Sequence, residues 1–201
     1  MNQIPVLSAG LNVSGGTIAG TIATATQNSI TTATGLTTVG AGGTASTVAG
    51  IPFFSADTSS IYTTDVSGTD DTASGNSAYG YQAMDAITTG DNNTAMGFGA
   101  LGANTTGSPN VAVGRAALAA NTTAANNVAV GDRALTTNTT GYSNTALGDR
   151  ALTANTTAHS NTAVGADSLA ANTTGSGNTA VGLSALLANT TGTRNLAIGF
   201  G

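Results

Sequence analysis

The chain has 201 residues and a formal net charge of −5 at pH 7, and only 6% of its residues are charged, against about a quarter in ordinary globular proteins. All four basic residues are arginine, so the chain has no basic patch and we expect no nucleic-acid binding. Cysteine is absent, which excludes disulfides and thiolate chemistry. No segment approaches the ~20 consecutive apolar residues that a spanning helix needs, so no membrane insertion is expected.

Residues 1–56 are rich in Thr, Ala and Gly, with β-branched residues every few positions. Such a segment buries little apolar surface by itself, and we interpret it as a β-rich shaft or attachment region that docks on other proteins. Ile51–Phe54 holds two of the four phenylalanines and is either an apolar plug or docking point or a local turn. Residues 57–75 form a polar linker. The N-terminus lacks a basic region followed by an apolar one, so no secretory signal is expected.

From residue 76 the chain repeats a 17-residue unit, roughly Asn-x-Ala-apolar-Gly-x-x-Ala-Leu-x-Ala-Asn-Thr-Thr-Gly-x-x. Seven full units fill residues 76–194, and a partial eighth follows at 195–201. Helix-containing repeats are longer, about 20–47 residues. The repeat therefore predicts an all-β fold, a parallel β-solenoid with two short strands per coil, "NTAVG" and "xxALxA", stacked about 4.8 Å apart.

Stacking places equivalent residues above one another in columns. Asparagine columns can pass amide hydrogen bonds from coil to coil, a threonine column can do the same with hydroxyls, and a glycine column allows a positive φ at each turn. The predicted structural ladders are Asn93, Asn110, Asn127, Asn144, Asn161 and Asn178; Gly97, Gly114, Gly131, Gly148, Gly165 and Gly182; and Leu118, Leu135, Leu152 and Leu169.

The first strand of each coil carries apolar residues on both faces. Alanine occupies one side, and the residue after it, for example Val113 or Leu147, occupies the other. One face can line the interior, whereas the other leaves an apolar stripe of the kind that marks an interface. The stripe predicts that the chain assembles, and a homotrimer is the simplest closed arrangement.

Matching positions in successive coils carry opposite charges. Arg115 is expected near Asp132 and Arg150 near Asp167, whereas Asp132 lies over Asp149 as a like pair. Surface pairs of this kind contribute little to stability, but they can fix the register between coils or chains.

The phrase "NTAVGxxALxAN" resembles the "NSxAIGxxAxA" phrase of YadA-like heads, which occur in phage tail fibres and trimeric autotransporter adhesins. The resemblance covers residues 76–201, although the family's usual period is shorter than the one here. It implies a left-handed β-roll packed as a homotrimer. It also implies a structural tail-fibre segment of a virion that displays or forms a host-adhesion rod. Its partners would be other virion or fibre proteins through residues 1–56, and a host receptor or polysaccharide.

Other functions are weighed against this one. The head of a trimeric adhesin on a bacterial cell surface is the runner-up. An ice-binding or carbohydrate-binding solenoid comes third, because only one threonine of each Thr-Thr pair is expected to face outward. An enzyme is not expected: His159, the only histidine, has no nucleophile held beside it, and a rod offers no cleft for a carboxylate pair. No catalytic, metal or cofactor residue is assigned, and any ligand-binding residues are unknown.

Overall fold

The computed structural model describes residues 72–201 in full and, before them, only the backbone of three short strands. These are β1 (Ser46–Val48), β2 (Ile51–Phe53) and β3 (Ile61–Tyr62). β1 and β2 form an antiparallel pair in which Val48 faces Ile51. Apart from these strands, the predictions for residues 1–71 lie outside the described residues, and of the predicted linker only residues 72–75 are described in full.

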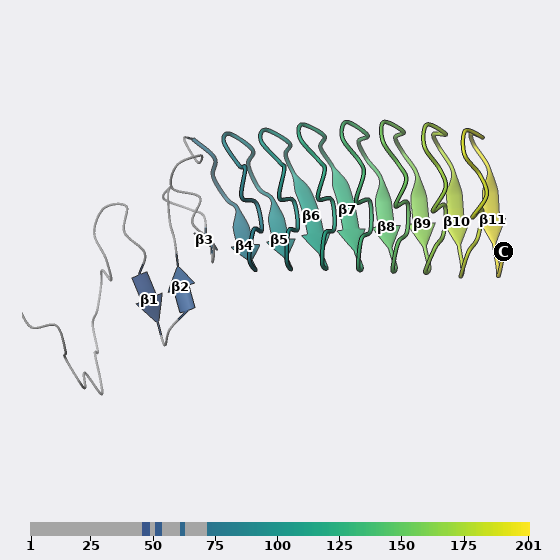
Figure 1. Cartoon of the computed structure of the whole chain (residues 1–201). Helices are drawn as coiled ribbons and strands as arrows, with labels where there is room; N and C mark the ends of the chain where they lie inside the picture. The colour runs from purple at the N-terminus through teal and green to yellow at the C-terminus, as the bar shows by residue number, and fades with distance from the viewer. Residues whose placement is uncertain (1–45, 49–50, 54–60, 63–71) are drawn as a thin grey trace, which may run out of the picture. The chain divides into compact units, whose positions relative to one another are not determined.

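The repeats form one parallel sheet in which strands follow each other in chain order from β3 to β11 (Figure 1). Each strand pairs with the equivalent strand of the next coil, so that Ala112 faces Ala129 and Ala129 faces Ala146. This register confirms a parallel β-solenoid with a 17-residue coil. The strands are β4 (Ser77–Tyr79), β5 (Thr94–Met96), β6 (Asn110–Val113), β7 (Asn127–Val130), β8 (Thr145–Leu147), β9 (Thr162–Val164), β10 (Thr179–Val181) and β11 (Leu196–Ile198).

β3 lies within the predicted linker and pairs in parallel with β4, where Ile61 faces Ser77. The sheet therefore gains a strand before the first full repeat at residue 76.

Each coil has one strand, and the prediction of a second strand at "xxALxA" is wrong. In the coil that starts at Asn110, this segment makes tight turns, closed by hydrogen bonds from Ala117 N–H to the Gly114 carbonyl (3.3 Å) and from Asn121 N–H to the Leu118 carbonyl (3.1 Å). Leu118 has a φ of 52°, which a strand cannot contain. The segment still bonds to its neighbour, because Leu118 N–H donates to the Ala134 carbonyl at 3.0 Å.

The interior is a narrow core of alanine and leucine, in which the strand alanines and the leucine column are buried. The left-handed backbone at each leucine costs about 1–2 kcal/mol. Full burial of a leucine side chain contributes about 1.5–3 kcal/mol, which offsets that cost. This balance holds the turn segment in place in the coils whose column residue is fully buried. The fully buried members of the column are Met84, Leu101, Leu118, Leu135, Leu152 and Leu169.

Candidate functional site

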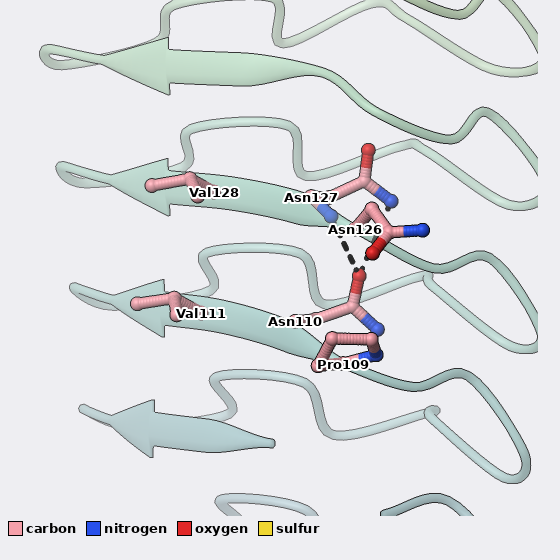
Figure 2. Close-up of a pocket in the computed structure, with 6 residues that line it drawn as sticks. All are labelled: Pro109, Asn110, Val111, Asn126, Asn127 and Val128. Atoms are coloured by element: carbon pink, nitrogen blue, oxygen red, sulfur yellow. Dashed lines mark hydrogen bonds between the residues drawn. The ribbon is translucent and has the colours of Figure 1, made fainter. Parts of the chain in front are cut away.

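The predicted asparagine ladder lies inside the solenoid. Asn110 Oδ1 accepts two hydrogen bonds from Asn127 of the next coil, one from the backbone N–H (3.0 Å) and one from Nδ2 (3.3 Å), as Figure 2 shows. Asn127 Nδ2 also donates to the Gly141 carbonyl at 2.9 Å. Both side chains are about 1% exposed. Because their polar atoms are engaged within the fold, these asparagines hold the stack together and leave little for a ligand.

A second ladder runs through the asparagine of each Asn-Thr-Thr turn. Asn121 Nδ2 donates to Asn104 Oδ1 at 2.8 Å and to the Ala124 carbonyl at 3.1 Å. The ladder begins at Asn104 because the preceding coil carries the buried Ile87 at this place. Threonine hydroxyls form a third column, in which the members from Thr88 to Thr173 donate to a backbone carbonyl of the next coil, for example Thr105 to Thr122 at 3.1 Å. The prediction of inter-coil hydrogen-bond columns is confirmed.

The glycine column stands where two coils approach closely. The φ values in this column lie between 128° and 142°, a region that residues with a side chain rarely adopt. The column consists of Gly97, Gly114, Gly131, Gly148, Gly165 and Gly182. An added Cβ at Gly97 would lie 2.6 Å from the Gly114 carbonyl oxygen. The column is therefore structural, as predicted.

The outer face of the sheet carries one apolar column and one mixed column of hydroxyl and apolar side chains. One contains Tyr79 (56% exposed), Met96 (52%) and Leu147 (46%), with half-buried valines in other coils. The second precedes the strand alanines and mixes threonine with Val111 and Val128, which are 36% and 38% exposed. The prediction of an alanine column on the inner strand face and an apolar column on the other face is confirmed for the single chain.

A shallow hollow of about 270 Å³ lies at one edge of this outer face. Figure 2 shows its lining: Val111 and Val128 extend in parallel from β6 and β7, and Pro109 and Asn126 lie where these strands begin. Apolar surface dominates the hollow. No ionisable group lines it, so acid–base chemistry is not available there.

The predicted charge pairs form a row across neighbouring coils. Arg115 meets Asp132 at 2.8 Å, and Arg150 meets Asp167 through two bonds of 2.8 and 2.7 Å. The hydrogen bond from Arg150 lowers the pKa of the Asp167 carboxyl, and the same contact raises the pKa of Arg150. Arg150 also lies 3.8 Å from Asp149. These pairs confirm the predicted cross-coil contacts.

Sequence reasoning missed a contact at the turn before β9. The ring of His159 stacks on Tyr142 of the preceding coil, with centroids 4.8 Å apart and planes 6° from parallel. Beyond His159 lies a hollow of about 310 Å³, lined by His159, Ser160, Ser176, Gly177, Thr193 and Arg194. The spacing of 17 between Tyr142 and His159 is the signal that would have found the pair, since equivalent positions stack.

The described residues contain no group of three or more His, Cys, Asp or Glu side chains placed to hold a metal ion. Within the same residues, no helix has the length and apolar character to cross a membrane. Comparisons with family models, with curated proteins and with solved structures return no match to this chain.

Proposed function

We propose that the chain is a structural fibre protein, a tail-fibre segment of a virion, whose solenoid assembles as a homotrimer and forms or displays a host-adhesion rod. The observation that carries this proposal is the apolar column on the outer face of a sheet whose inner face is already packed. A parallel sheet is normally covered on both faces. Here the strand alanines cover only the inner side.

A second copy of the chain is the occupant that fits this face best. The two outer columns repeat with the same spacing in every coil from β4 to β11, so an identical rod presents a matching periodic surface. Three such rods close the face around one axis. The hollow beside Val111 and Val128 is suited to receive apolar side chains from a neighbouring rod.

The interior supports a structural role rather than catalysis. Its polar residues bond to the next coil, and its apolar residues fill the space between strand and turn. A rigid rod acts through display, because weak contacts at its surface or tip are multiplied when several copies are held together. The resemblance of the repeat to YadA-like heads points in the same direction. Attachment through residues 1–56 and binding of a host receptor or polysaccharide belong to the same proposal.

Light scattering on the intact chain tests the assembly. The expected mass is about three times the chain mass of 19.2 kDa. Leu147→Asp places a charge on the outer face and should lower the mass to that of one chain. Leu187→Asp is the matched control, because Leu187 is 44% exposed against 46% for Leu147 but lies in the turn segment rather than in the sheet. It should leave the mass unchanged.

A folded monomer of the unaltered chain would contradict the proposed rod. An adhesin head at a bacterial surface predicts the same trimer, so mass does not separate it from a tail fibre. Antibody labelling of purified virions separates the two, because a tail-fibre segment is expected on the virion fibres and an adhesin head is not. A monomer would favour the single-solenoid alternatives, ice binding or carbohydrate binding, although the exposed threonine of each Thr-Thr pair forms only one column.

A further inference from the structure

The hollow beside His159 is not needed for the rod, and its origin lies in the residues of one column. Tyr142 and His159 are large and stack on each other, whereas the next coil has Ser176 at the equivalent place and Gly177 after it. These small residues leave space above the imidazole. Arg194 bounds that space in the following coil, where its Cγ would lie 3.5 Å from a Cβ added to Gly177.

We propose that this hollow binds a carboxylate-bearing sugar, such as a uronic acid unit of a glycan. Tyr142 covers one face of the imidazole, and the hollow lies in the coils on the other side, so His159 presents a flat face to it. A flat ring face packs well against the apolar C–H face of a sugar ring. The volume of about 310 Å³ lies at the lower end of the ~300–1,000 Å³ of small-molecule sites.

The charge of the site selects an acidic sugar. Arg115, Arg133 and Arg150 each meet an aspartate. Among the described residues, Arg194 is the one arginine with no carboxylate within ion-pair distance. It lines the hollow, and no Asp or Glu side chain is among the other lining residues. A free guanidinium forms a strong, directional pair with a carboxylate.

Hydroxyl groups supply the remaining contacts that a sugar needs. Ser160, Ser176 and Thr193 line the hollow. Ser176 Oγ accepts a hydrogen bond from the backbone N–H of His159 at 3.1 Å. The hydroxyl hydrogen of Ser176 therefore remains available to donate to a ligand oxygen. A ring face, a cation and several hydroxyls thus converge in one place, the composition expected of a sugar site.

The only histidine of the chain provides a unique reporter. In proton NMR of the intact protein at fixed pH, the Cε1–H resonance of His159 is followed while tetragalacturonate is added into the millimolar range. Maltotetraose, a neutral sugar, and inorganic phosphate serve as parallel titrants. We expect a saturable shift with tetragalacturonate and none of comparable size with the other two.

Matched variants test the assigned contacts. Arg194→Gln should raise the Kd about tenfold, the size of one charge-assisted hydrogen bond, and Arg133→Gln, an exposed arginine outside the hollow, should leave it unchanged. Tyr142→Phe keeps the stacked ring and should bind as the unaltered protein does, whereas Tyr142→Ser should weaken binding.

Three results would overturn the site: no saturable shift, an equal response to maltotetraose or phosphate, or the same Kd in Arg194→Gln. The site lies within one chain, so it does not depend on the trimer. If the protein is a monomer in light scattering and His159 still shows the shift, the proposed trimeric rod is contradicted and the proposed sugar site is supported.

Discussion

Replacing Gly148 with alanine tests whether the glycine column sets the spacing of the coils. Gly148 has a φ of 142°, a region that costs a residue with a side chain about 1–3 kcal/mol. The added Cβ would lie 2.5 Å from the Gly165 carbonyl oxygen, and ordinary contact begins at 3.4 Å, so the next coil must retreat by about 0.9 Å. The bond from Gly165 N–H to the Leu147 carbonyl, 2.8 Å long, would then exceed the usual limit of about 3.2 Å.

Loss of that bond adds about 1 kcal/mol, so Gly148→Ala should lower the free energy of unfolding by about 2–4 kcal/mol. Urea unfolding of the intact chain, followed by circular dichroism, measures the change. Gly102→Ala is the matched control, because a Cβ added there would lie no closer than 3.3 Å to the atoms around it and its φ is not left-handed, and the equivalent positions of other coils carry Ala119 and Ala170. We expect a change within about 1 kcal/mol there. Equal losses in the two variants would refute the role of the glycine column.

Three further predictions follow from single side chains. Ser168 has a buried hydroxyl without a partner among the described residues, and other coils have alanine in its place, so Ser168→Ala should raise the free energy of unfolding by about 1 kcal/mol in urea. Asn138 donates to Asn121 Oδ1 at 3.2 Å and to a backbone carbonyl at 2.8 Å, so Asn138→Ala should lower it by about 2–4 kcal/mol, since these acceptors stay buried. Arg150 lowers the pKa of Asp167. The pair therefore stabilises the fold above the unfolded-state pKa of about 4 and loses this effect as pH falls through the lower folded-state pKa. The urea midpoints of wild type and Asp167→Asn should differ at neutral pH and converge in acid.

Each of these predictions has an outcome that contradicts it. A destabilised Ser168→Ala protein would mean that its hydroxyl has a partner. An Asn138→Ala protein no less stable than Thr140→Ala, an exposed neighbour, would show that the ladder contributes nothing. A midpoint difference for Asp167→Asn that is the same at pH 7 and in acid would exclude the ion pair as its cause.

The sequence predicts the coil well because its period is strict. Asn110 and Asn127 recur 17 residues apart, and a parallel stack is the arrangement in which such residues meet. Ala112 and Val113 alternate, which predicts one inner and one outer face, and both are observed. The turn segment differs, because Leu118 in isolation disfavours a left-handed backbone. Its conformation depends on burial and on the hydrogen bond to the next coil, which are tertiary effects that local propensity does not contain.

The hollow beside His159 escapes prediction for a different reason. It arises from residues that break the repeat, and its size depends on the absence of a side chain at Gly177 and a small one at Ser176. A consensus of the units averages such residues away. Aligning the units column by column, rather than reading their consensus, places Tyr142 under His159 and makes the contact predictable.

The direction of the inter-coil hydrogen bonds has a mechanical consequence. These bonds run along the axis of stacking, so a force that separates the two ends of the solenoid opens them one coil after another instead of shearing strands past each other. Each coil that separates from the stack frees 17 residues, whose extended length is about 58 Å at about 3.4 Å per residue. In the stack, the same coil adds only about 4.8 Å to the length of the solenoid. Because the coils are equal in length and nearly equal in bonding, the chain lengthens under load in uniform steps and absorbs work at each one.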